Sequence, residues 1–343
     1  MSIAINLAEQ GWLPDPILRT GVRRLVNQRL VEERTQPVEA KASMIASLAE
    51  SPIALSTAEA NDQHYEVPTE FFQAALGPHL KYSASIFPED DTSLAEAERF
   101  TLEGYADKLD LASGMRVLDL GCGWGSFSLW LAQQRPDLEI VAVSNSRTQK
   151  NFIESRAQLA LLDNLTVLTA DINHLELEPD SFDRAISVEM FEHVRNYRTL
   201  LSRISHWLKP EAYLLVHIFC HKTFVYPFKT EGDDNWMGKY FFTDGLMPSV
   251  DTLSHFQEHL SIDKQWLYSG HHYRRTARAW LQNMDVASDQ VWACFEQTYG
   301  KDAKIWFHRW RMFFIACEEM FGYADGEEWQ VAHYRFKNTG LLG

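Results

Sequence analysis

The segment VLDLGCGWGSFSLWLA, residues 117–132, constrains the fold of this chain most strongly. Apolar strand residues run into Gly121, Gly123 and Gly125, and an apolar helical pattern follows. Glycines at such a turn let the backbone approach a ligand closely, and the helix that follows offers unpaired N–H groups. The pattern predicts a βα unit that binds a nucleotide-like cofactor at the carboxyl end of a strand. A glycine-rich turn without a ligand is the alternative interpretation.

The residues around the glycines indicate which cofactor this is. A dinucleotide site needs a glycine where this chain has Ser126, and an acid at the end of the second strand. That strand, EIVAVSNS, ends without a carboxylate, whereas Asp119 precedes the first glycine. Asp-x-Gly-x-Gly-x-Gly resembles the first motif of class I S-adenosylmethionine (SAM) methyltransferases. The resemblance implies that Asp119 serves the ammonium end of SAM.

Strand and helix patterns alternate through the middle of the chain. Strands are expected at 116–120, 139–143, 165–169, 183–188 and 212–219, and helices at 126–134, 146–161 and 196–208, the last ended by Pro210. Such alternation predicts an α/β fold with a doubly wound parallel sheet. Late strands at 262–269 and 330–337 could complete the sheet as an antiparallel pair, with helices at 274–299 and 301–321 between them.

Two regions are expected. Residues 1–100 form a helical N-terminal cap, and residues 101–343 form a Rossmann-like methyltransferase domain with an aromatic-rich helical insertion at about 221–325. The aromatic segment HYEVPTEFFQAALGPHLKYSASIF, residues 64–87, is expected to fold over the cofactor because its rings favour burial.

Composition excludes several functions. A net charge of −15 disfavours nucleic acid and anionic membranes. A stripe of arginines at Arg19, Arg23, Arg24 and Arg29 is either a solvated helix face or a membrane contact. The chain shows neither a signal-peptide pattern nor an apolar run long enough to span a membrane. Its four scattered cysteines indicate the cytoplasm, and no metal site is expected.

Polar residues follow the second and third strands. Asn145 or Gln149 could bind a ribose in place of the missing acid, although capping of the next helix would also explain Asn145 or Ser146. Asp171 could accept a hydrogen bond from an adenine amino group, or it could be a turn aspartate.

The fourth strand is followed by Glu189, Glu192 and His193. Their i, i+3, i+4 spacing would place all three on one face of a helical turn beside the cofactor. Carboxylates can bind an ammonium group, and an imidazole can take its proton. An alkylamine needs this help, because deprotonation at neutral pH costs roughly 4–5 kcal/mol. A solvated turn is the alternative interpretation.

From about residue 60 onward the chain resembles the cyclopropane-fatty-acid synthase superfamily, and within it the coclaurine N-methyltransferase-like branch. The matching runs are HYEVPTEFF, VLDLGCGWGSF, VSNSRTQK, ADI, VEMFEHVRNY, FCHKTFVYPF, DDNWMGKYFF, MPS and FGYADGEEW, together with WLPDPILRTGVRR near the start. The resemblance implies SAM dependence and catalysis by Glu189, Glu192 and His193. It also places Tyr82, Ser83 and Ile172 beside SAM, and Tyr323 and Trp329 in the substrate pocket, where ordinary aromatic core is the alternative for both.

The chain departs from the lipid-modifying branch. Those enzymes bind a bicarbonate through a cysteine where this chain has Ala84, and through a late-helix tyrosine that here corresponds to Met312 or Phe313. Glu192 and His217 remain, although His217 could simply be a polar residue at a strand end. A carboxylate, Glu189, is gained where the lipid enzymes have a small residue.

The resulting hypothesis is a SAM-dependent methyltransferase that acts on the nitrogen of a small amine. Two alternatives stay open: an enzyme that methylates or cyclopropanates lipids, and a SAM-binding regulator without activity. A homodimer is compatible with the sequence.

Overall fold

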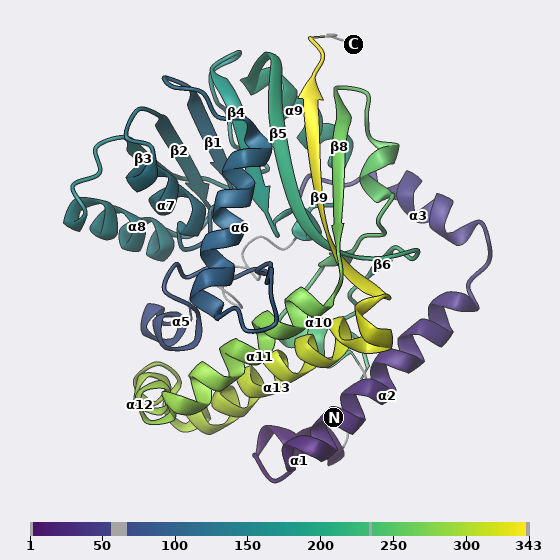
Figure 1. The fold of residues 1–343 in the computed structure, drawn as a ribbon. Helices are drawn as coiled ribbons and strands as arrows, with labels where there is room; N and C mark the ends of the chain where they lie inside the picture. Colours follow the sequence, from purple (N-terminus) through teal and green to yellow (C-terminus); the bar gives the residue numbers. More distant parts are fainter. Residues whose placement is uncertain (1–2, 56–66, 233–234, 341–343) are drawn as a thin grey trace.

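The computed structural model describes residues 3–55, 67–232 and 235–340, and within them it forms a seven-stranded sheet (Figure 1). Of the aromatic segment 64–87, which is expected to fold over the cofactor, residues 64–66 lie outside the described residues. The strands of the sheet are β1 (Arg116–Leu120), β2 (Glu139–Ser144), β3 (Leu165–Thr169), β4 (Phe182–Val188), β5 (Leu208–His221), β8 (Leu260–Tyr268) and β9 (Trp329–Asn338).

The strand order is β3-β2-β1-β4-β5-β9-β8. Strands β1 to β5 pair in parallel, whereas β9 is antiparallel to both of its neighbours, so the expected parallel sheet with a late antiparallel pair is confirmed. Several boundaries differ from the sequence prediction, and within the sheet the largest difference is at the start of β5. The helix expected at 196–208 ends at Trp207, before Pro210 is reached. Pro210 lies inside β5 and therefore does not itself end the helix, as the sequence had suggested.

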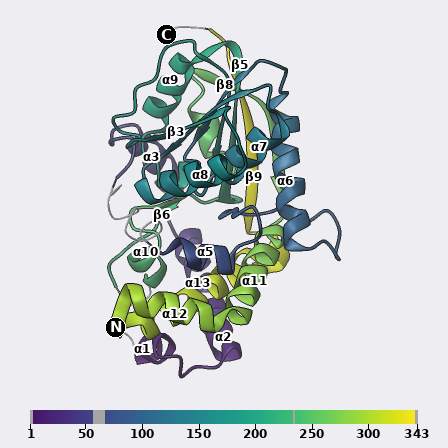
Figure 2. The same cartoon turned by 90° about the vertical axis from the view of Figure 1, so that its left-hand side faces the viewer.

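Helices cover both faces of the sheet. On one face, α6 (Leu94–Leu109), α7 (Ser126–Gln134) and α8 (Arg147–Leu159) bury residues such as Phe127 and Ile153 against the strands. On the other face lie α9 (Tyr197–Trp207) and α3 (Ala40–Leu48). Figure 2 shows the two layers on either side of the strands.

A further helical layer lies beyond the carboxyl ends of the parallel strands (Figures 1 and 2). It consists of α1 (Ile3–Glu9), α2 (Asp15–Arg34), α5 (Thr69–Ala75), α10 (Trp236–Tyr240), α11 (His271–Val286), α12 (Ser288–Tyr299) and α13 (Ala303–Phe321). Aromatic rings fill its core; Trp310, for example, lies 4.6 Å from Phe71 and 5.0 Å from Phe241 between ring centroids. The single helix expected at 274–299 is two helices, because the chain turns at Ala287.

Several short elements lie between the longer helices and strands. They are β6 (Tyr226–Pro227) paired with β7 (Leu246–Met247), and the 3₁₀ turns at Phe191–His193, Thr252–His255, Gly300–Asp302 and Tyr323–Gly326.

The N-terminal helices pack on the C-terminal insertion. Arg19 pairs with Glu318 at 2.8 Å and Glu319 at 2.7 Å on α13, and Arg23 pairs with Glu319 at 2.5 Å. Part of the arginine stripe is thus used inside the molecule. The division at residue 100 stays a prediction; α6 spans that residue and packs on the sheet, while α2 and α13 share one core.

In the part of the chain that the structure describes, no helix is both long enough and apolar enough to cross a membrane.

Candidate active site

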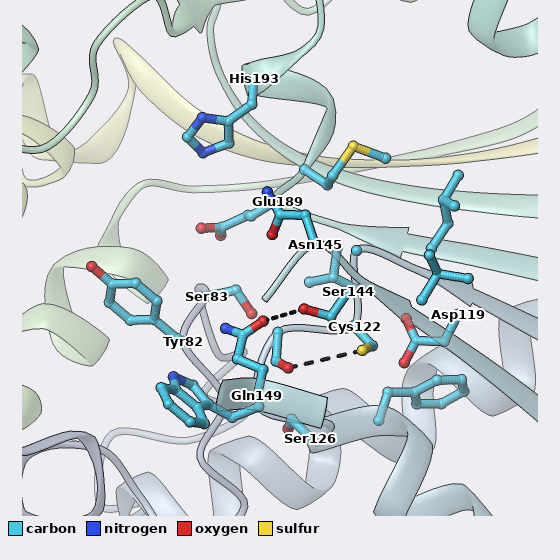
Figure 3. Close-up of a pocket in the computed structure, with 18 of the residues that line it drawn as sticks. Tyr82, Ser83, Asp119, Cys122, Ser126, Ser144, Asn145, Gln149, Glu189 and His193 are labelled. Atoms are coloured by element: carbon cyan, nitrogen blue, oxygen red, sulfur yellow. Dashed lines mark hydrogen bonds between the residues drawn. The ribbon is translucent and has the colours of Figure 1, made fainter. Parts of the chain in front are cut away.

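A cavity opens at the carboxyl ends of β1, β2 and β4, between the sheet and the helical layer (Figure 3). The glycine turn, the ends of β2 and β4, the segment Leu80–Ser83 and aromatic residues of the helical layer line it. Parallel α/β sheets bind ligands at this edge, so the cavity lies where the sequence predicts the cofactor.

The glycine turn has the backbone conformation that only glycine adopts readily. Gly121, Gly123 and Gly125 have φ of 79°, 54° and 75°. A Cβ on Gly121 would lie 2.7 Å from the Met190 side chain, whereas a Cβ on Gly123 would meet no protein atom within 4 Å. Gly123 also lines the cavity, so its missing side chain leaves space beside a ligand rather than beside protein.

Asp119 lines the cavity and is 2% exposed. Its carboxylate accepts a hydrogen bond of 2.5 Å from Ser128 Oγ on α7. Burial raises the pKa of Asp119 to about 6, against the opposing effect of that hydrogen bond. A buried acid of this kind is stabilised by a cation, as the expected ammonium group of SAM would provide.

The sequence left open which residues after β2 cap the next helix and which face the cofactor. Ser146 caps α8 by accepting the N–H of Gln149 at 3.2 Å. Asn145 and Gln149 line the cavity (Figure 3). Asp171 accepts the N–H of Asn173 at 2.8 Å, as a turn aspartate does, and its neighbour Ile172 lines the cavity.

Several buried polar atoms of the cavity wall have no partner within the described residues. They are Trp124 Nε1, Ser126 Oγ and Gln149 Nε2. Buried donors are rarely left unpaired, because each costs roughly 1–3 kcal/mol. Gln149 Oε1 is held by Ser144 Oγ at 2.7 Å, which points the amide nitrogen at the cavity (Figure 3). These donors and the open glycine turn fit a ligand with hydroxyl and ring-nitrogen acceptors, as SAM has.

Glu189 projects into the same cavity and is held by three donors. Its Oε1 accepts from the Ala84 N–H at 2.8 Å and from His217 Nε2 at 3.1 Å, and its Oε2 accepts from Tyr273 Oη at 2.8 Å. Its φ of 48° lets the chain turn sharply out of β4. Burial raises the pKa of Glu189 to about 7, while Lys81 and the hydrogen bonds oppose that rise.

The expected common helical face of Glu189, Glu192 and His193 does not form. The left-handed conformation of Glu189 ends the strand, and the 3₁₀ turn covers only Phe191–His193. Glu192 is therefore fully buried, and its Oε1 accepts the Phe219 N–H at 2.7 Å. Burial raises its pKa well above the usual range, with Glu189 adding repulsion. Only Glu189 and His193 of the three line the cavity.

The three residues expected in the substrate pocket do not line this cavity, and their role towards a substrate stays a prediction. His217 is buried beneath Glu189, and its Nδ1 contacts Tyr105 Oη at 2.6 Å and His333 Nε2 at 2.9 Å. Trp329 is 1% exposed and donates to Tyr226 Oη at 2.9 Å. The Tyr323 hydroxyl donates to Asn27 on α2 at 2.9 Å. None of the three is among the residues that line the cavity.

The structure adds cavity residues that sequence reasoning missed. They are Lys81, Phe219, Phe242, Tyr273 and Phe313. The Phe242 ring lies 4.5 Å from the His193 ring between centroids. The sequence predicts an aromatic-rich insertion at about 221–325, but only the packing of the helical layer on the sheet reveals which of its rings face the cavity. Tyr82 and Ser83 line it as expected.

The sheet order, the glycine turn and the buried acid before it define the fold of class I methyltransferases. Residues 54–331 match the family model for mycolic acid cyclopropane synthetase. The chain is 36% identical over 338 residues to (S)-coclaurine N-methyltransferase of Thalictrum flavum subsp. glaucum, an alignment that covers 96% of this chain and 93% of that enzyme. It is 32% identical over 282 residues to cyclopropane-fatty-acyl-phospholipid synthase of Escherichia coli K12, with 81% of this chain and 68% of that enzyme covered.

Among solved structures, coclaurine N-methyltransferase bound to N-methylheliamine and SAH superimposes with a TM-score of 0.93 at 35% identity, covering 98% of this chain and 99% of the other. The chain belongs to the mycolic acid cyclopropane synthetase family, in its coclaurine N-methyltransferase-like branch.

Proposed function

We propose that this chain transfers a methyl group from SAM to the nitrogen of a small amine that carries an aromatic ring. The observation that carries the proposal is the Glu189 carboxylate, which lies in the cavity wall among aromatic rings and beside an imidazole. The chain is a SAM-dependent methyltransferase, as its N-methyltransferase relatives support.

The acceptor end of the cavity suits a cation that is joined to an apolar body. Phe219, Phe242, Tyr273 and Phe313 present rings there. Aromatic faces attract ammonium groups, and their area binds an apolar substituent. A carboxylate in the same wall completes a site for a protonated amine, because charge, ring faces and hydrogen-bond acceptor come together.

Glu189 acts through its negative charge and is not the group that accepts the proton. Three donors already converge on its carboxylate, and this arrangement favours the ionised form. An ionised Glu189 attracts the ammonium group of the acceptor and orients its nitrogen. The hydrogen bonds hold the carboxylate in place, so this orientation needs no rearrangement.

His193 takes the proton that the nitrogen must lose. Its imidazole lines the cavity, packed on Phe242, and a neutral imidazole is a suitable base near pH 7. The loss of this proton leaves the nitrogen with the lone pair that it needs to accept a methyl group. When bound, SAM supplies the electrophilic methyl group and a neutral thioether leaving group.

The residues that would hold SAM are those that line the other end of the cavity. Asp119 is suited to the ammonium end, and the turn at Gly121 and Gly123 provides backbone room. Asn145 and Gln149 are suited to the ribose, and Tyr82 and Ser83 border the methionine portion.

A substrate comparison tests the proposal. Tetrahydroisoquinoline is a secondary amine fused to an aromatic ring, and piperidine is the matched amine without that ring. We expect methylation of tetrahydroisoquinoline with a kcat/KM at least tenfold above that of piperidine, measured by product mass spectrometry. Equal values would argue against the aromatic acceptor site, and no transfer to either amine would argue against N-methylation.

Localisation in the cytoplasm, a homodimeric state and the absence of nucleic-acid partners belong to the same proposal. The net charge of −15 and four cysteines, none of them in a disulfide, support the first and the last of these.

A further inference from the structure

Lys81 is a buried cation that the mechanism above does not use. It is 2% exposed and lies at the start of the segment that carries Tyr82 and Ser83 into the cavity. Lysine is almost never fully buried without a partner, because removing an ammonium group from water costs several kcal/mol. A buried lysine beside a reaction cavity therefore calls for a function.

The contacts of Lys81 join the cofactor side of the cavity to the acceptor side. Its Nζ donates to Ser83 Oγ at 2.7 Å and to the Ala84 carbonyl oxygen. The N–H of the same Ala84 donates to Glu189 Oε1 at 2.8 Å. Lys81 thus fixes the short turn that borders the methionine portion of the cofactor site, and this turn in turn holds Glu189.

The charge of Lys81 is balanced by buried acids. Glu189 and Glu98 both attract it, and its ammonium group lies 5.5 Å from the centroid of the Tyr105 ring. Glu98 accepts the His79 N–H at 2.9 Å and thereby fixes the chain that leads to Lys81. Burial lowers the pKa of Lys81 to about 8, so the ammonium form still prevails at neutral pH.

We propose that Lys81 is a positioning residue that holds the 82–84 turn and supplies the buried positive charge that keeps the Glu189 carboxylate ionised. The inference rests on the proposed function of Glu189, but it concerns the free protein as well. The acceptor site then presents a negative charge to an incoming ammonium, while the counter-charge is held in the cavity wall by Ser83 and Ala84.

Other titratable groups also face Glu189, and the test has to separate them from Lys81. They are Glu192 on the 3₁₀ turn, His217 on β5, Tyr105 on α6, Tyr273 on α11 and Cys317 on α13. Lys81 also opposes protonation of His217. Because E189Q leaves His217 in place, comparing backgrounds with and without E189Q isolates the effect of Lys81 on Glu189.

The first measurement is the thermal unfolding of the cofactor-free protein at pH 7.5, where both Lys81 and Glu189 are mainly charged, for wild type, K81M, E189Q and K81M/E189Q. Methionine is nearly isosteric with lysine but uncharged. We expect K81M to lower Tm at least twice as much in the wild-type background as in the E189Q background, because only the former keeps a buried carboxylate without its cation. Equal losses in both backgrounds would overturn the proposal. If K81M alone fails to fold, folding of the double variant supports it and failure of both overturns it.

The second measurement is the pH dependence of kcat/KM for the amine at saturating SAM. We expect the acid limb of K81M to move upward by about one pH unit, which is a roughly tenfold loss below the limb. K81R, which keeps the charge, should restore the position of the limb.

R184M is the control: Arg184 is a buried cation bonded to the Leu109 and Asp110 carbonyls at the far end of β4. A shift of the limb in R184M equal to that in K81M would refute the assignment, whereas inactivity of every variant and wild type towards amines would refute the proposed function alone, leaving the unfolding test valid.

Discussion

Glu189→Gln should make the cofactor-free protein more stable and the enzyme much less active. The amide is nearly isosteric: its oxygen can accept from Ala84 N–H and His217, while its NH₂ group faces Tyr273 Oη, which can accept. The substitution therefore removes a buried charge while leaving the hydrogen bonds satisfied.

The size of the effect follows from the pKa. A carboxyl group whose pKa is raised to about 7 in the folded protein keeps a proton that the unfolded chain loses near 4.5. Stability therefore falls as pH rises between these values and is constant above, by about 3 kcal/mol in total. E189Q removes this loss, which corresponds to a rise in Tm of about 5 °C at pH 8.5 and less at pH 5.

The assay combines calorimetric unfolding of the cofactor-free protein at both pH values with methyl transfer to an amine. We expect kcat/KM to fall by about 10²–10³-fold, the usual loss when a preorganised electrostatic group is removed. A fall in Tm at pH 8.5 together with the loss of activity would refute the reasoning, since it would mean that the Glu189 carboxylate stabilises the fold.

Three further predictions concern the same cavity. G123A should weaken SAH binding at least tenfold in calorimetry, while G114A, which has a similar positive φ of 76° but lies outside the cavity lining, should bind SAH as wild type does. Both variants should lose a similar, small amount of Tm because alanine is strained at a positive φ; equal SAH affinities for both variants would contradict the assignment of the Gly121–Gly123 turn to SAM. H193N should lower kcat by about 10²–10⁴-fold with SAH affinity retained, and wild-type turnover in this variant would exclude His193 as the base. E98Q should gain stability relative to wild type between pH 5.5 and pH 8, because burial raises the pKa of Glu98 to about 7 and its ionisation destabilises the fold as pH rises; a pH-independent difference in Tm would contradict this.

Much of the cofactor side could be predicted from the sequence, because local rules determine it. A buried strand followed by Gly121 and Gly123 is typical of a cofactor-binding turn, and the carboxyl ends of parallel strands meet at one side of the sheet. Asp119, Asn145, Gln149 and Ile172 accordingly lie in the cavity wall. Asp171 is not among the residues that line the cavity, and its Oδ1 accepts the Asn173 N–H, so its contact with adenine stays a prediction.

The acceptor side could not be predicted in the same way. The i, i+3, i+4 argument assumed helical backbone, but the positive φ of Glu189 separates it from Glu192, which turns into the core. Tyr273 and Phe313 reach the cavity only through the packing of α11 and α13 on the sheet edge, and periodicity does not encode that packing. The resemblance places Trp329 in the substrate pocket; in the structure its indole donates to Tyr226 Oη, and its role towards a substrate stays a prediction.

The most direct test of the central claim uses SAM labelled on its methyl group, offered simultaneously to tetrahydroisoquinoline and to vesicles of unsaturated phospholipid. We expect label in the amine, at least tenfold less label in the lipid, and loss of amine labelling in E189Q. Label that accumulates in the lipid and not in the amine would contradict this expectation, and would assign the chain the activity of its lipid-modifying relatives.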